Sequence, residues 1–281
     1  MPDAPNDTTA EVTTSDGHTT YYLCQDNEEL FEEQYSGGFE APMDVGVARP
    51  GTNAAYLLVN GTVRIHSIVM DSVFNFETKR AVYCLGEGGT LKDFEFDPDQ
   101  WQWTEGNLEA RGFAAAPDTH FEAVLRGGKH REVFFQSLTG QIASVRSNEG
   151  QTWELCDAFP ATNASAGASL CFLQAGDREY LFYAHQQNSI HALVFDRGGW
   201  EEERIGGSPQ GFPVHNIYAE LQETGYRLQF CDQGGGVYIL AGGETVRIGS
   251  IVHGEFKRDN DAQADRLLLE IKAPPKVKGA K

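Results

Sequence analysis

The apolar and polar residues of the chain repeat the pattern of a short antiparallel hairpin. The clearest copy runs from Arg178 to Trp200, with an apolar strand over 179–184, a polar turn over 185–189 and a second strand over 190–195. Large apolar residues that alternate between stretches of Gly, Asn and Asp are typical of half-buried antiparallel strands. Related copies begin at Thr19, Arg80, Arg131 and Tyr226.

The spacing of these copies predicts an all-β propeller. Successive copies begin 61, 51, 47 and 48 residues apart, and a period of roughly 40–50 residues that holds about four short strands is typical of propeller blades. We therefore expect five four-stranded antiparallel blades, with six as the alternative. The long first step contains an extra hairpin that turns at Asn60-Gly61 and is either an insertion or the remnant of a sixth blade.

The predicted propeller occupies most of the chain. Residues 18–272 are expected to form one domain, between a polar, disordered leader (1–17) and a disordered tail rich in Pro and Lys (273–281). The first unit lacks a strand ahead of Thr19. We expect Leu267–Ile271 to supply this strand and close the ring, because an open propeller leaves two unpaired sheet edges.

The net charge of the chain disfavours some classes of binding partner. The 281 residues include 22 Lys and Arg against 41 Asp and Glu, a formal net charge of −19 at pH 7. Such a surface repels phosphate groups, so nucleic acids and anionic membranes are poor partners. No stretch is apolar for long enough to suggest a transmembrane helix. A small apolar or sugar-like ligand is the expected partner, and the sequence leaves a homodimer open.

Motifs for metals, nucleophiles and phosphates are not found in the sequence. The five cysteines are scattered without a CxxC, and the eight histidines form no HxH or HExxH, which predicts no metal site. The run Gly234-Gly235-Gly236 lies in a predicted hairpin turn and precedes no helix, unlike a phosphate-binding loop. There is no GxSxG motif. We therefore expect a protein that works without a cofactor.

The sequence leaves the location of the protein open. The polar N-terminal residues lack the apolar core of a signal peptide. Asn60 and Asn163 nevertheless lie in glycosylation sequons at predicted turns. The secretory pathway is expected if these two residues carry glycans.

The hairpin followed by a tryptophan resembles the fungal fucose-specific lectin family of β-propellers. The resemblance covers about residues 19–250. It is carried by Arg80, Arg131 and Arg178 at strand starts, by the small turns before Leu91, Ile142 and Ile190, and by Trp101, Trp103, Trp153 and Trp200. The resemblance implies sugar sites between neighbouring blades, where an Arg and a Glu bind hydroxyl groups and aromatic rings stack on the sugar.

The implied sugar-binding set is incomplete in every repeat. The family's Glu falls on Asp93, Ser144 and Ala192, and the first unit keeps an acid of the right length, Glu32, but has Thr at its Arg position. Ser and Ala cannot accept hydroxyl hydrogen bonds as a carboxylate does. We therefore expect weak or no fucose binding, without the gain in avidity of about 10²–10⁴ that repeated sites provide.

The most complete of these sets combines Arg80, Asp93 and Trp103. A degenerate ring keeps its fold and one asymmetric cavity, and such a cavity is the usual place for a small-molecule site. Some fungal natural-product pathways place cofactor-free cyclases on unexpected binding scaffolds, and this chain looks like such a case by analogy. The hypothesis is a cyclase or pericyclase that joins two apolar, polyunsaturated partners, as in an intermolecular hetero-Diels–Alder reaction.

Each residue type has a role in this hypothesis. Arg80, Arg131 or Arg178 would polarise a carbonyl oxygen, and Asp93, His185 or His191 would move a proton if a dehydration must first create the diene. The expected ligand-binding residues are Tyr22, Glu32, Tyr83, Trp103, Trp153, Tyr183 and Trp200.

Two other interpretations of the sequence stay open. The alternative function is a fucose-binding lectin without catalysis, and a non-catalytic interaction propeller is the third. In a purely structural interpretation, the arginines hold hydrogen bonds between blades, the tryptophans pack the blades together, and the histidines occupy turns or satisfied core positions.

Overall fold

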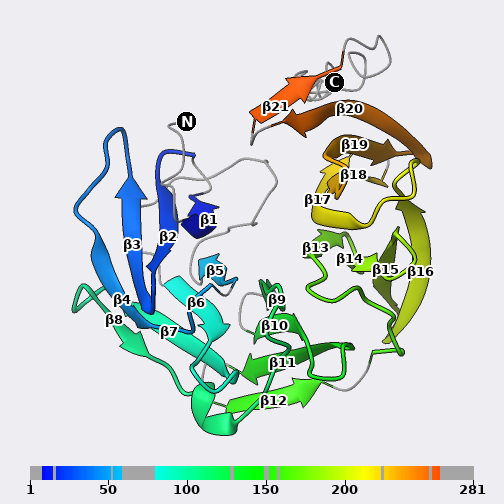
Figure 1. Ribbon diagram of the computed structural model, residues 1–281. Helices are drawn as coiled ribbons and strands as arrows, with labels where there is room; N and C mark the ends of the chain where they lie inside the picture. Colours follow the sequence, from blue (N-terminus) through cyan, green and yellow to red (C-terminus); the bar gives the residue numbers. More distant parts are fainter. Residues whose placement is uncertain are drawn as a thin grey trace, which may run out of the picture.

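The strands of the chain form a five-bladed β-propeller. A computed structural model describes residues 8–14, 17–51, 53–58, 80–126, 130–148, 152–156, 159–222, 225–252 and 255–259. Its five antiparallel sheets are meanders in which each strand pairs with the next along the chain. The sheets stand as blades around a central axis, with the first strand of each blade nearest the axis (Figure 1). The predicted all-β propeller with five blades is confirmed.

The blades follow one another along the chain. Blade one contains β1 (Thr8–Thr13), β2 (Thr20–Asp26), β3 (Glu29–Tyr35) and β4 (Met43–Val47). Blade two contains β5 (Ala55–Leu58), β6 (Arg80–Leu85), β7 (Leu91–Asp97) and β8 (Gln102–Glu105). Blade three contains β9 (Glu122–Arg126), β10 (His130–Gln136), β11 (Ile142–Asn148) and β12 (Thr152–Cys156).

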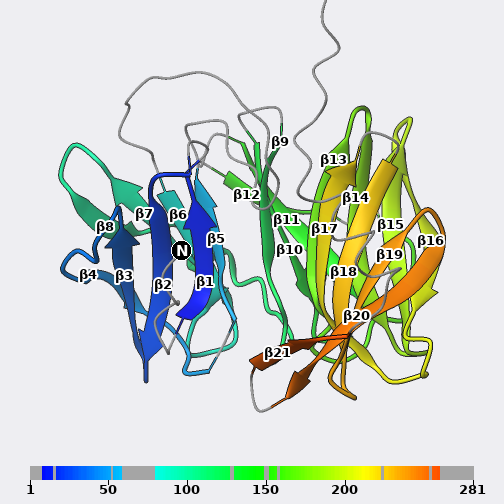
Figure 2. The ribbon, with the colours of Figure 1, turned by 90° about the horizontal axis from the view of Figure 1, so that it is seen from above.

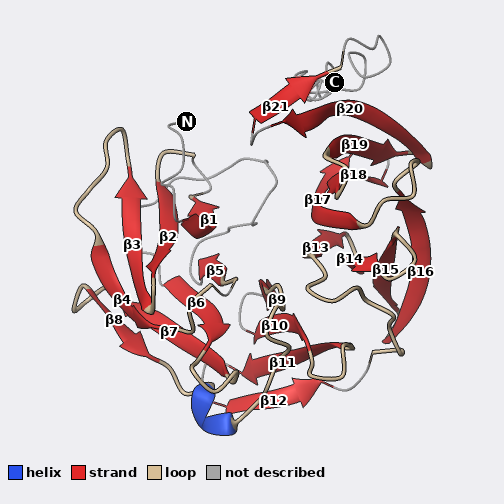
Figure 3. Cartoon of the chain, in the orientation of Figure 1, coloured by secondary structure: helices blue, strands red, loops and turns tan. Residues whose placement is uncertain are grey.

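The last two blades have longer strands. Blade four contains β13 (Leu170–Ala175), β14 (Arg178–His185), β15 (Ser189–Asp196) and β16 (Gly199–Gly207). Blade five contains β17 (Val214–Gln222), β18 (Gly225–Asp232), β19 (Gly236–Ala241), β20 (Glu244–Val252) and a fifth strand, β21 (Glu255–Arg258), which extends its outer edge (Figure 2). Among the described residues the helical element is the short 3-10 helix η1 (Glu109–Arg111; Figure 3).

The hydrophobic core lies mainly between neighbouring blades. One cluster joins blades one and two, a second joins blades two and three, and the largest spans blades three to five. The second strand is buried along most of its length in blades one to three, as in β6, where all six residues are buried. The outermost strands face solvent, and Glu201, Glu202 and Glu203 of β16 are exposed.

The N-terminal segment differs from the prediction. Thr8–Thr13, expected in a disordered leader, form β1 and pair antiparallel with β2. Val12 is buried in the core between blades one and two, which gives this polar segment an apolar anchor. The first blade thus has an inner strand from the N-terminal side, and the predicted closing strand Leu267–Ile271 lies outside the described residues. No helix in the described part of the chain is long and apolar enough to span a membrane.

Candidate functional site

A buried ion pair connects blades one and two. Arg80 opens β6 and Glu32 lies in the middle of β3, and their Nη2 and Oε1 atoms are 2.9 Å apart with both side chains 3% exposed. The hydroxyl group of Tyr56, on β5, donates to the other carboxylate oxygen of Glu32. The Arg and Glu expected in a sugar site are therefore brought together, but they come from different blades and bind each other.

Aromatic rings cover the guanidinium group of Arg80. Its central carbon lies 3.6 Å from the ring centroid of Phe96, 4.5 Å from that of Tyr21 and 5.7 Å from that of Trp103. Burial raises the pKa of Glu32 to about 7, although Arg80 acts in the opposite direction. The carboxylate is thus buried at the boundary between two blades, called a seam below, where a sugar has no access to it.

A similar pair connects blades two and three. Arg131, on β10, donates from Nη1 to Glu95, on β7. The buried phenol of Tyr83 is coupled to the same arginine, and burial raises its pKa well above the ordinary value. The ring of Trp153 meets that of Tyr83 edge-on at 5.8 Å. These four side chains pack the seam, as the structural interpretation of the arginines and tryptophans expects.

The third seam uses an arginine that the repeat did not identify. Arg126, on β9, forms ion pairs with Glu132 at 2.9 Å and with Glu179 of blade four at 2.6 Å. Its guanidinium carbon lies 5.3 Å from the ring centroid of Trp200. Arg178, the repeat's arginine, instead has a side chain 58% exposed and pairs with Asp196 of its own blade at 3.0 Å. Arg178 and Arg80 therefore lie in different environments, although both stand at the start of a second strand.

Asp93 does not complete the set predicted around Arg80. Its Oδ1 accepts a hydrogen bond of 2.9 Å from the backbone N–H of Leu108, in the loop that follows β8. Burial raises the pKa of Asp93 to about 6. A Cβ atom added to Gly106 would lie 2.2 Å from this carboxyl group, so the loop packs directly against it. Asp93 is therefore buried against the loop that follows β8 and anchors this loop by a hydrogen bond.

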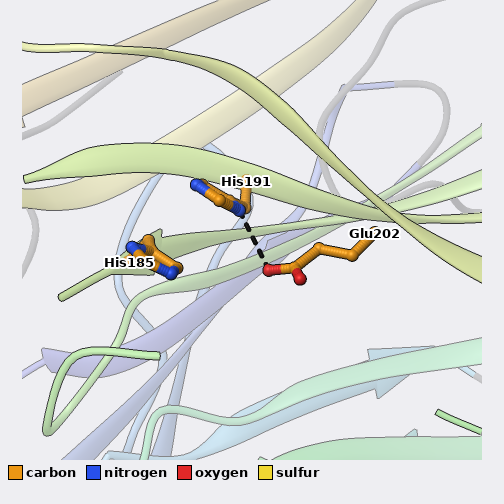
Figure 4. Close-up of side chains that lie close together, drawn as sticks. All are labelled: His185, His191 and Glu202. Atoms are coloured by element: carbon orange, nitrogen blue, oxygen red, sulfur yellow. Dashed lines mark hydrogen bonds and ion pairs between the residues drawn. The ribbon is translucent and has the colours of Figure 1, made fainter. Parts of the chain in front are cut away.

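Blade four carries a different constellation on one face of its sheet. Tyr183 on β14 and His191 on β15 are cross-strand partners. His185 lies two residues after Tyr183 on β14. Glu202 lies on β16, two residues before Arg204, which is the other cross-strand partner of His191. Because side chains alternate between faces along a strand, these four side chains point the same way. Figure 4 shows the rings of His185 and His191 beside Glu202. The two rings are stacked, with their centroids 4.0 Å apart and an interplanar angle of 9°.

Hydrogen bonds link the members of this cluster. Nδ1 of His191 lies 2.9 Å from Oε1 of Glu202, and the hydroxyl group of Tyr183 donates to the same oxygen. The pKa of Tyr183 is raised well above its ordinary value by burial and by this carboxylate. Burial, with His191 nearby, lowers the pKa of His185. The arrangement combines a carboxylate, a phenol and two imidazoles, which are groups that can hold or transfer a proton.

A cavity of about 440 Å³ lies next to this cluster. It is lined by Gln187, Asn188, Arg204, Ile205, Gly206, Gly207, Ser208 and Gly211. Arg204 joins the two features, because it borders the cavity, is the cross-strand partner of His191 and influences the charge state of His185. The lining is mainly polar, and the exposed ring of Phe212 follows Gly211 in the chain.

The remaining predicted residues lie away from this cavity. Tyr22, Trp103 and Trp153 are buried in the blade packing, and Trp200 packs against Phe159 and Phe195. Asn163 is exposed, as a glycan acceptor requires, whereas Asn60 lies outside the described residues.

The sequence missed Glu202 and Arg204. They lie in a charged run that looks like a solvated face, and the pairing of β15 with β16 is what brings them to the histidines. The alternation of charged residues along β16 is the signal that could have separated Glu202 and Arg204 from Glu201 and Glu203.

Comparisons with known proteins identify the fold. No family model matches the chain, and no curated protein matches it in sequence. Among solved structures, AofleA from Arthrobotrys oligospora gives a TM-score of 0.67 at 15% identity, over 87% of this chain and 73% of that chain. The Aleuria aurantia lectin in complex with Fucalpha1-6GlcNAc gives 0.63 at 17% identity, over 92% and 82%.

An enzyme is also among the similar solved structures. A polysaccharide lyase, an ulvan lyase, gives a TM-score of 0.57 at 13% identity, over 90% of this chain and 74% of that one. The A. aurantia lectin is described as six-bladed, whereas five blades are seen in the described part of the present chain. At these identities the comparisons establish the architecture, and the chain has the lectin-like β-propeller fold seen in fungal fucose-specific lectins.

Proposed function

We propose that the protein is a carbohydrate-binding propeller that takes one saccharide at the blade-four cavity. The observation that carries this proposal is the polar lining of that cavity, where Gln187, Asn188, Arg204 and Ser208 surround a space of about 440 Å³. Amide, hydroxyl and guanidinium groups suit a polyhydroxylated ligand. Phe212, which follows the lining residue Gly211 in the chain, is an exposed aromatic residue on which a sugar ring could pack.

The repeated seams between blades do not support several fucose sites. Between blades one and two, Arg80 and Glu32 form a buried ion pair, and aromatic rings enclose the arginine. Between blades two and three, Arg131 is committed to Glu95. A sugar would have to break these buried pairs before it could form its own hydrogen bonds, and a buried charge left without its partner is costly. One site per chain is therefore the expected stoichiometry.

Calorimetric titration with methyl α-L-fucoside, together with a glycan array, tests this proposal. We expect at most weak fucose binding, array hits for other saccharides, and a stoichiometry of one for those hits. Arg204→Ala should abolish binding of the array hits, whereas the exposed Arg178→Ala should leave it unchanged. Several equivalent fucose sites of micromolar affinity would show that the seams open. An array without any hit would overturn carbohydrate binding.

A second candidate is favoured by the histidine cluster. A cofactor-free enzyme of the cyclase or pericyclase type would use His185 or His191, beside Glu202, to move the proton in a dehydration that creates a diene. Arg204, at the border of the cavity, would polarise a carbonyl oxygen of the ligand. Holding a diene and an alkene in register can contribute up to ~7–11 kcal/mol to a hetero-Diels–Alder step.

The residues proposed for this second candidate differ from those expected from the sequence. The predicted donors Arg80 and Arg131 are buried in ion pairs, and the predicted aromatic walls Tyr83, Trp103 and Trp153 pack between blades. Incubation of the purified protein with a polyunsaturated carbonyl compound and an alkene, beside His191→Asn, tests the chemistry. A product with the rate and stereoisomer ratio of the protein-free control would refute the cyclase hypothesis.

A further inference from the structure

We infer that His185, His191 and Glu202 form a binding site for one divalent cation of the zinc class. The ligand atoms of the three side chains all lie within 4.8 Å of one another. Zinc binds imidazole nitrogen at roughly 2.0–2.1 Å and carboxylate oxygen at roughly 2.0–2.2 Å, so two ligands of one ion are about 3–4 Å apart. A modest movement of side chains therefore brings the three donors onto one ion.

The donor set has the chemistry of a known class of metal site. Two imidazoles and one carboxylate bind zinc in enzymes that keep a further coordination position open. The same set suits other divalent transition metals that accept nitrogen and oxygen ligands. The sequence predicted no metal site because the histidines are six residues apart and Glu202 is eleven residues further on. The β14–β15–β16 meander is what places the three side chains on one face.

The surroundings of the three donors support the inference. Nε2 of His191 is buried and has no hydrogen-bond partner in the described structure, and a buried polar atom without a partner is an exception that needs an explanation. The hydroxyl group of Tyr183 donates to Glu202. Carboxylates that bind metals are usually oriented by such an outer hydrogen bond, so Tyr183 is the expected positioning residue.

The rings must adjust for the ion to bind. The imidazoles of His185 and His191 are stacked nearly parallel, and the lone pairs of parallel rings do not converge on one point. Nδ1 of His185 also accepts a hydrogen bond of 3.1 Å from the backbone N–H of Gln187. Rotation of one ring about its χ2 torsion, which is broad for histidine, lets the donors converge. Arg204 opposes the positive ion, whereas the net charge of −19 favours it.

Titration of the untagged, chelator-treated protein with Zn²⁺ in a calorimeter tests the site. We expect one ion per chain, and we expect the absorption of bound Co²⁺ to show nitrogen and oxygen ligands. Glu202→Gln and His191→Asn should each weaken Zn²⁺ binding at least tenfold, and Tyr183→Phe should weaken it less. His215→Asn is the matched control, because it alters a different histidine neighbourhood, that of His120, and should leave the affinity unchanged.

Circular dichroism melting shows whether each variant is folded. Glu202→Gln preserves the shape of the side chain and serves as the decisive variant if His191→Asn unfolds. Absence of one-to-one binding by the folded parent protein would overturn the inference. Equal Zn²⁺ affinity in the parent and in folded Glu202→Gln would overturn it as well, because the ion would then be held elsewhere.

Discussion

Replacing Arg80 by methionine should destabilise the propeller in a manner that depends on pH. Methionine fills a similar space between Phe96 and Tyr21 but removes the cation that faces Glu32. Loss of one partner from a buried ion pair costs about 3–5 kcal/mol, because the other charge is left unpaired. Glu32 can avoid part of this cost by taking up a proton, since its pKa is already about 7.

The direction of the pH dependence follows from the pKa of Glu32. In the parent protein the folded-state pKa is raised from 4.5 to about 7. The carboxyl group therefore favours the folded state most below pH 4.5, and this contribution is lost as the pH rises to about 7. Without Arg80 the pKa rises further, so the variant continues to lose stability above pH 7 by about 1.4 kcal/mol per pH unit. The difference between variant and parent should therefore grow by about 2 kcal/mol between pH 7 and 8.5.

Urea unfolding followed by tryptophan fluorescence at pH 7 and pH 8.5 measures this difference. A loss of 3–5 kcal/mol corresponds to a melting temperature lower by roughly 6–20 °C for a chain of this size. Arg178→Met is the control, because Arg178 is exposed, and its unfolding midpoint should not change at either pH. An Arg80→Met variant as stable as the parent at both values would refute the buried-pair argument. A loss of the same size at both values would show that Glu32 is not coupled to Arg80.

Three further outcomes follow from the packing. Gly106→Ala should lower the free energy of unfolding, measured by urea titration, by about 1–3 kcal/mol, because its Cβ would lie 2.2 Å from the Asp93 carboxyl group. Gly88→Ala is the control, because its Cβ would point into open space and should leave the free energy of unfolding unchanged. Val12→Ala should cost about 1.5 kcal/mol through lost burial of β1, and an unchanged melting temperature would contradict a docked β1. A thiol reagent applied to the folded protein should modify at most the two half-buried thiols, Cys156 and Cys231. The other three cysteines are buried, and burial raises the pKa of Cys84 to about 12. Rapid reaction of all five thiols would argue against this burial.

The periodic pattern of the sequence determined the architecture. Hairpins that recur every 47–61 residues, each with a tryptophan or an equivalent outer strand, require a repeated sheet that buries both faces against its neighbours. The blades therefore follow from local alternation and turn residues alone. The prediction of a disordered leader is wrong for Thr8–Thr13. These residues are mostly polar, and their place in a sheet depends on pairing with β2 rather than on their own apolar content.

Tertiary structure decided which environment surrounds each of the residues that hold the same place in the repeat. Arg80 and Arg178 hold the same place in the repeat, yet one is buried against Glu32 of the preceding blade and the other is exposed beside Asp196. Local sequence cannot distinguish them, because the difference lies in what the neighbouring blade presents. His191 and Glu202 likewise meet only through the register of β15 on β16. The sequence set the side-chain alternation of each strand, and the pairing of strands and blades selected which side chains meet.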